Sequence, residues 1–390
     1  MKSAVVAFDP RSVSLSHGSV TRRIPAFDYL RAFVIFLVVL HHAVMAYCTG
    51  GHAARGGDYT KATAPVVDPA QWDGFNLMVI GNDSFFMPLM FLLAGLFVRP
   101  SLARKGLGRY LADRALRLGI PLLVGIVAVV PLSYYASYLQ SGGTASFPAF
   151  WARMVTVGPW PSGPLWFVGA LLAFDTATAL ALSRDPVRLG VRRLLAALDR
   201  RPKVVWFAAF LGLAALVFLP ALAVLGPSLW LTAGPFGIQA SRIGLYAFFF
   251  VAGVIMGADR LAALFEARWQ GWPLLAALAA VLFFTVHGAT LPAIADGVPM
   301  LLFCVAMALG LLAVAVHFGR RRSAVGDSLG ANAYGIYLLH YPIVLWLQYK
   351  LLPVPLGPVS KGSLVLASGF ASSWLAASLL RRVPGVARIV

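Results

Sequence analysis

The sequence consists of long apolar runs separated by short polar segments. Ten runs approach the length of about 20 residues that an α-helix needs to cross a bilayer. In chain order they cover residues 32–49, 76–98, 119–139, 164–182, 203–225, 241–258, 272–291, 298–318, 331–351 and 361–380. The runs are too long for spanning β-strands, and a spanning chain must satisfy its backbone hydrogen bonds internally. The pattern therefore predicts an all-α, polytopic integral membrane protein with about ten transmembrane helices.

Composition supports this fold class. Hydrophobic residues make up 60% of the 390 residues and charged residues only 12%, whereas soluble domains average about 45–50% and about 25%. The aromatic content is 12%, whereas disordered chains contain few aromatic residues. A soluble globular protein and a disordered protein are both excluded.

The charge indicates the orientation in the membrane. The net charge is +18, from 32 Lys and Arg against 14 Asp and Glu. If the N-terminus is inside, 26 of the 32 basic residues fall in the arm, the inner loops and the tail, and six fall outside. Basic residues collect in the cytoplasmic loops of membrane proteins. We therefore expect both termini in the cytoplasm, and the excess needs no nucleic-acid partner.

One membrane domain is expected at residues 25–382, between a polar cytoplasmic arm at 1–24 and a short cytoplasmic tail at 383–390. The arm has no apolar segment, which argues against a cleaved signal peptide. The two cysteines, Cys48 and Cys304, have no spacing typical of a metal site or a disulfide framework. We expect no metal and no permanently bound cofactor.

The first apolar run carries the best candidate constellation, Asp28, Arg31 and His42. At about 100° per residue, Arg31 and His42 lie about 20° apart around a helix and about 16 Å apart along it. Ionisable side chains inside a span are costly and usually face a cavity. Two other interpretations remain open: Asp28 and Arg31 form an interfacial ion pair, and a histidine, above all His41, forms a polar contact between helices.

A second set of candidates lies in the run 331–351. Tyr334, Tyr337 and Tyr341 share one helix face, beside His340. His340 is expected at nearly the depth of His42, and Asp175 lies about as far from the ends of its own run. Two histidines and one carboxylate at one depth predict a site near the middle of the membrane, although a tyrosine stripe is also typical of packing.

The segment 99–117 combines basic residues, including Arg114 and Arg117, with regularly spaced leucines. One interpretation is an amphipathic helix that lies on anionic lipid. The other is a phosphate-binding surface, since guanidinium groups match phosphate oxygens.

These residues resemble the membrane acyltransferase-3 family, whose hallmark is Arg-x10-His in the first helix. Arg31 and His42 match that hallmark, and further landmarks follow in the same order over residues 23–345. They are Phe85-Phe86-Met87-Pro88 to Ala94-Gly95, Arg114-x-x-Arg117-x-x-x-Pro121, Pro164-Leu165-Trp166-Phe167 and Tyr334-x-x-Tyr337-x-x-His340-x-Pro342. The Met-Pro pair is more similar to the branch that modifies periplasmic glucans. Ala94 departs from the Ser-Gly of many members, so a hydroxyl role cannot apply there, although Ser84 is near.

The resemblance implies O-acylation of a cell-envelope carbohydrate by a multi-pass protein of the bacterial inner membrane. The acyl group, acetyl or succinyl, would come from cytoplasmic acyl-CoA. His42 would be the general base or a transient acyl carrier, because imidazole titrates near neutrality. Arg31, oriented by Asp28, would stabilise negative charge.

The remaining candidates are expected to bind substrate. Arg114 and Arg117 would hold the CoA phosphates, and the other positions would line the substrate path. These other positions are Trp166, Tyr334, Tyr337, His340 and, from its depth alone, Asp175.

Two other classes of function remain open. A secondary transporter for a sugar or a lipid-linked glycan also places polar groups at the midplane, but matching halves with broken helices are not evident in the sequence. A non-catalytic partner in glycan assembly would tolerate the loss of His42.

Overall fold

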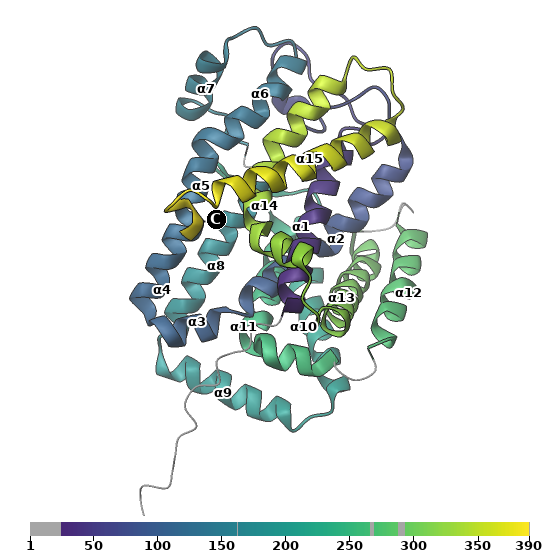
Figure 1. The fold of residues 1–390 in the computed structure, drawn as a ribbon. Coiled ribbons are helices and arrows are strands. Elements are labelled where there is room, and N and C mark those ends of the chain that lie inside the picture. The colour runs from purple at the N-terminus through teal and green to yellow at the C-terminus, as the bar shows by residue number, and fades with distance from the viewer. Residues whose placement is uncertain (1–24, 162, 266–268, 288–292, 390) are drawn as a thin grey trace, which may run out of the picture.

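The computed structural model describes residues 25–161, 163–265, 269–287 and 293–389 (Figure 1). The expected N-terminal arm, residues 1–24, lies outside the described residues. Within them the fold is a helical bundle, as the apolar pattern predicts. The helices are α1 (Pro25–Met45), α2 (Asp73–Gly95), α3 (Val98–Lys105), α4 (Leu107–Arg114), α5 (Ile120–Val124), α6 (Val130–Gln140), α7 (Phe147–Thr156), α8 (Trp166–Leu182), α9 (Asp185–Asp199), α10 (Lys203–Leu225), α11 (Ile243–Phe265), α12 (Gly271–Val286), α13 (Ala293–Phe318), α14 (Ala324–Leu351) and α15 (Pro358–Leu380).

Among the described residues, eight helical segments are long and apolar enough to cross a membrane. They are Pro25–Met45, Asp73–Lys105, Leu107–Gln140, Gly163–Leu182, Val204–Leu225, Ala240–Phe265, Ile294–Phe318 and Pro358–Leu380. The other two expected spans are also helices. α12 is apolar but has only 16 residues. α14 has 28 residues, and its polar side chains lower its mean hydropathy. The chain is a polytopic membrane protein.

Three segments expected as loops contain regular structure. α9 lies across one end of the bundle (Figure 1), with Leu195 buried and Arg192 and Arg193 exposed. α7 lies at the other end. The strands β1 (Trp230–Ala233) and β2 (Phe236–Gln239) pair in an antiparallel hairpin between α10 and α11. We name the end with α9 and the start of α1 the arginine-rich end, and the end with α7 the opposite end.

α1 packs against α2, α13, α14 and α15. Tyr29 of α1 donates a hydrogen bond to Asp327 of α14 over 2.8 Å. Near the C-terminal ends of α1 and α14, the Gln348 side chain donates hydrogen bonds to the carbonyl oxygens of His42 at 2.7 Å and Ala43 at 3.1 Å. The last carbonyls of a helix have no partner within it. Gln348 therefore fixes the end of α1 against α14, at the position of His42.

α2 and α11 cross at two glycines. A Cβ atom on Gly95 would lie 2.2 Å from the carbonyl oxygen of Phe250, and one on Gly253 would lie 2.2 Å from that of Leu92. Because both neighbours are backbone atoms, a side chain cannot be accommodated by a rotamer change. The close approach requires glycine at both positions.

The segment 46–72 covers the opposite end of α1. Asp68 in this segment accepts a hydrogen bond from Lys361 of α15 over 2.7 Å, and the two side chains are 2% and 3% exposed. Val67 exchanges two hydrogen bonds with the side chain of Gln140. The segment is therefore attached to both α15 and α6.

Candidate functional site

Two histidines that are far apart in the sequence meet where α1 packs against α14. The ring of His42 lies 5.3 Å from the ring of His340 and 5.0 Å from that of Tyr341, measured between centroids. His41 is 5.2 Å from His42 and stacks on Phe86 of α2. The structure thus brings together the two histidines expected at one depth, and adds His41 beside them.

His340 is completely buried and has a defined orientation. Its Nδ1 lies 2.7 Å from the carbonyl oxygen of Tyr337. A carbonyl oxygen only accepts hydrogen bonds, so this contact assigns the proton of the neutral ring to Nδ1. Nε2 is then an acceptor, and it has no hydrogen-bond partner among the described residues. An unsatisfied basic nitrogen is therefore buried beside His42.

His41 and His42 border a cavity of about 920 Å³, whereas His340 lies buried behind its wall. His41, His42, Tyr337 and Tyr341 line it from α1 and α14. Segments of the opposite end also line it, including Thr60, residues 159–161, residues 163–164 and the β1–β2 hairpin. The cavity therefore lies on the side that the charge distribution places outside the cytoplasm. Its volume is in the range of sites that bind small molecules.

The cavity wall combines aromatic surfaces with a few polar groups. Trp160, Trp166, Trp230 and Tyr246 contribute rings, and the polar side chains include those of Asp83 and Gln239. Tyr59 lies next to Thr60 in the sequence but outside the lining, and burial raises the pKa of Tyr59 above its usual value. Apolar walls with a few fixed polar groups are typical of ligand sites.

Arg31 and Asp28 lie on the same helix as His42, several turns closer to its N-terminus. Arg31 Nη1 is 3.4 Å from Asp28 Oδ1, and the guanidinium lies over the ring of Phe97 at 5.6 Å. Both residues are on α1 near the arginine-rich end, about 16 Å along the helix from His42 for Arg31. Neither lines the cavity. The structure pairs Asp28 with Arg31, as the spacing suggests, but keeps both away from His42.

Asp175 does not join the histidines, and the expectation of one depth is wrong for this residue. Its carboxylate accepts a hydrogen bond from Tyr110 at 2.7 Å and lies 3.2 Å from Arg114 Nε. The physical reason is the position of α8. The helix begins beside Pro164, whose carbonyl accepts a hydrogen bond from Tyr337. Asp175 follows 11 residues later, about 16 Å further along the helix axis.

The other predicted residues divide between the two regions. Trp166 and Tyr337 line the cavity. Arg114 pairs with Asp175, and its guanidinium lies 5.0 Å above the ring of Tyr110. Arg117 has an exposed side chain, while its carbonyl accepts a hydrogen bond from Tyr334 at 2.8 Å. Trp166 and Tyr337 are thus separate from the arginines.

A layer of aromatic rings lies between these regions. Phe91 is completely buried, and its ring centroid lies 4.8 Å from Phe167, 5.3 Å from Phe174 and 5.2 Å from Tyr246. Phe167 and Phe174 stand on α8 between Trp166 at the cavity and Asp175. The layer separates the cavity from the Arg114–Asp175 pair.

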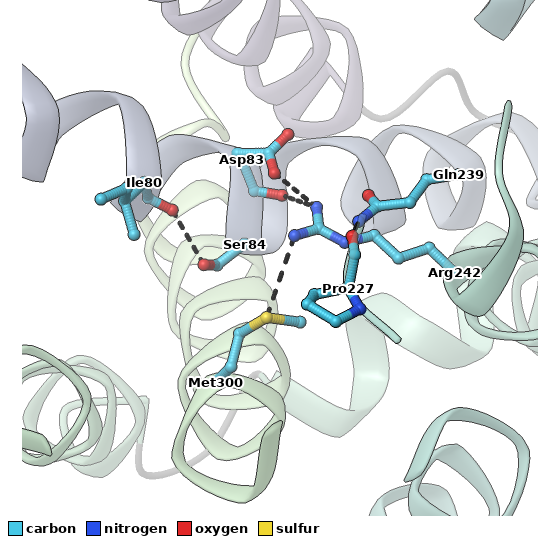
Figure 2. A network of polar contacts seen from close by, with 7 residues as sticks. All are labelled: Ile80, Asp83, Ser84, Pro227, Gln239, Arg242 and Met300. Carbon is cyan, nitrogen blue, oxygen red and sulfur yellow. Dashed lines mark hydrogen bonds and ion pairs between the residues drawn. The ribbon is translucent and has the colours of Figure 1, made fainter. Parts of the chain in front are cut away.

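The ion pair of Asp83 and Arg242 is the main feature that sequence reasoning did not identify. Arg242 Nη1 lies 2.6 Å from Asp83 Oδ2 and 2.9 Å from the Asp83 carbonyl oxygen (Figure 2). A signal existed, since Asp83 is an ionisable residue inside the predicted span 76–98. Its partner is 159 residues away and was counted only as an outer-loop charge.

Metal ligation is not evident in the part of the chain that the structure describes. Among those residues, no group of three or more His, Cys, Asp or Glu is placed to hold a metal ion.

A family model matches most of the chain. It is the model of Acyl_transf_3, described as an acyltransferase domain, and it covers residues 24–378. A search of the curated proteins found no match. The matched segment includes His41, His42 and His340, the residues that line the cavity, and Arg31, Arg114 and Arg117.

Proposed function

The chain belongs to this acyltransferase family, and on that premise we propose that it transfers an acyl group from acyl-CoA to a hydroxyl group of a cell-envelope carbohydrate. The observation that carries the proposal is the contact of His42 with His340 at the wall of an aromatic cavity. Acetyl and succinyl groups both satisfy the chemistry. A protein of the bacterial inner membrane, with the cavity facing outward, would fit the distribution of basic residues.

His42 is the general base of the proposed reaction. The acceptor oxygen attacks the thioester carbonyl carbon, a C–O bond forms and the C–S bond breaks. The hydroxyl proton passes to His42 and then to the departing thiolate, so the products are an O-acyl sugar and free CoA. Positioned general bases contribute about 10²- to 10⁴-fold to such reactions. His340, with its proton held at Nδ1, lies behind His42 and offers Nε2 to orient the His42 ring.

The donor would bind from the arginine-rich end. Arg31, Arg114 and Arg117 supply guanidinium groups for the CoA phosphates, and Asp28 orients Arg31. The acyl-bearing arm would then extend about 16 Å from Arg31 to His42.

The aromatic wall supports a carbohydrate acceptor. Sugar rings present C–H faces that pack on flat aromatic surfaces, and hydroxyl groups that bond to polar side chains. Trp160, Trp166 and Trp230 provide such surfaces around Asp83 and Gln239. The resemblance to the glucan-modifying branch agrees with an acceptor of this class.

The test uses purified protein in lipid vesicles, labelled acetyl-CoA or succinyl-CoA, and candidate glycans. His42→Gln keeps the size of the side chain and should lower the rate of acyl transfer about 10²- to 10⁴-fold. The control is His52→Gln, because His52 is exposed in segment 46–72 and, among the described residues, only its backbone makes hydrogen bonds. Transfer at the wild-type rate by His42→Gln would contradict the mechanism.

Two further outcomes are informative. Labelled protein that forms without acceptor, and loses its label when glycan is added, would make His42 an acyl carrier instead of a base. Passage of unmodified glycan across the vesicle membrane without acyl transfer would support a transporter.

A further inference from the structure

The Asp83–Arg242 pair has an asymmetric environment. The side chain of Arg242 is 13% exposed, whereas that of Asp83 is 43% exposed. Arg242 contacts Oδ2 and the carbonyl oxygen of Asp83, and its other terminal nitrogen lies 3.9 Å from the sulfur of Met300 (Figure 2). The guanidinium is therefore enclosed, and the carboxylate is the accessible member of the pair.

The accessible carboxylate belongs to the cavity. Asp83 lines it together with Ile80, Phe86 and Met87, which stand on the same face of α2 at helical spacing. Asp83 Oδ1 accepts no hydrogen bond from the described residues. A carboxylate oxygen on the wall of this cavity, which His42 also lines, is a strong acceptor without a donor among the described residues.

The charges of the pair indicate which ligand it suits. Arg242 and Asp83 compensate each other, so the site presents a dipolar surface with no excess charge. A cationic ligand would compete with Arg242, and an anionic ligand would meet the carboxylate first. A neutral polyol supplies O–H donors without a charge of its own. The nearby Trp160 and Trp230 rings fit the apolar face of a sugar.

We propose that Asp83, held in place by Arg242, is the acceptor subsite of the cavity and recognises hydroxyl groups of a neutral hexopyranose. Asp83 Oδ1 accepts hydrogen bonds from one or two adjacent hydroxyls. Arg242 keeps the carboxylate fixed and contacts no substrate, so it is a positioning residue. The identity of the acceptor class rests on the proposed function. Sugar binding at this subsite can nevertheless be measured without acyl-CoA.

The experiment is a binding titration on the full-length protein in lipid nanodiscs, in the absence of donor. The probes are methyl hexopyranosides of the gluco, galacto and manno series and their monodeoxy derivatives. In the wild type, removal of the hydroxyl that Asp83 binds should weaken binding about tenfold or more, as for other hydrogen bonds to charged groups. In Asp83→Asn the parent sugar should bind about 10- to 100-fold more weakly, and the same deoxygenation should cost nothing further.

Controls separate recognition from stability. Asp83→Asn leaves the enclosed Arg242 without its charge partner, so D83N/R242Q, which removes both charges, is measured in parallel. Asp199→Asn removes a second Asp–Arg pair, with Arg260, from the arginine-rich end and should bind sugar as the wild type does. Thermal unfolding identifies which variants remain folded.

Two results would overturn the subsite. One is a folded Asp83 variant that discriminates the deoxy sugars as the wild type does. The other is wild-type protein that binds none of the sugars while it still transfers acyl groups to a different hydroxyl acceptor. Sugar binding that depends on Asp83, in a protein without acyl transfer, would keep the subsite and refute the proposed function instead.

Discussion

The buried ion pair between Lys361 and Asp68 offers a prediction about how the cavity is closed. Lys361 stands in the first turns of α15, and Asp68 lies in the segment 46–72 that covers the opposite end of α1. Thr60 and Pro65 of the same segment line the cavity. Substitution of Lys361 by methionine removes the charge and keeps most of the side-chain volume.

The structure allows the cost to be worked out. Both side chains are almost fully enclosed, so Asp68 would keep a buried charge without compensation apart from the Ala70 amide, which donates to it at 2.8 Å. Removal of one partner of a buried pair costs about 3–5 kcal/mol. Removal of both charges, in K361M/D68N, should recover most of this loss because no uncompensated charge remains.

The assay is the free energy of unfolding in mixed micelles, measured for both single variants and the double variant. The matched control is Lys350→Met, since Lys350 is exposed at the end of α14 and surface substitutions change stability by about 0.5 kcal/mol or less. The folded Lys361→Met protein should also show a raised KM for the acceptor and an unchanged KM for acyl-CoA. If the losses of unfolding free energy in the two single variants simply add up in the double variant, the two residues have no coupling energy and the reasoning is refuted.

Two other substitutions test the packing that holds the site. Gly95→Ala should destabilise the protein by about 1–3 kcal/mol, because the new methyl group would meet the Phe250 carbonyl. The control is Gly212→Ala, which should be neutral or stabilising in the same unfolding assay, because nothing lies within 4 Å of the added methyl group. Gln348→Leu should cost about 1–3 kcal/mol and lower kcat, because it leaves the carbonyls of His42 and Ala43 without their donor; full activity and stability in this variant would contradict the role of Gln348.

The sequence predicted the helices well because the bilayer constrains them strongly. Each expected span corresponds to a helix, and the missed regular structure lies outside the long apolar runs. α9 and the β1–β2 hairpin were missed because neither is needed to cross the membrane. Their positions depend on tertiary contacts, such as the burial of Leu195.

The site was only partly predictable. His42 and His340 could be paired because each depth was counted from the end of its own helix. The same count failed for Asp175, because it assumed that α8 begins at the membrane surface, whereas α8 begins beside Pro164 at the level of Tyr337. Asp83 lay within a predicted span and carried a usable signal. Its pairing with Arg242 could not be found, since no local pattern links residues 159 positions apart.

The polarity of α14 has a consequence for biosynthesis. This helix carries Tyr337, His340 and Tyr341, and it falls short of the hydropathy that marks the eight spans. Polar residues near a helix centre oppose insertion from the translocon, whereas Leu and Ile favour it. α14 packs closely on α15, where Trp374 donates a hydrogen bond to Ser328 over 3.2 Å. We therefore expect its entry into the bilayer to depend on these neighbours, and the histidine pair to form only after α15 has been integrated.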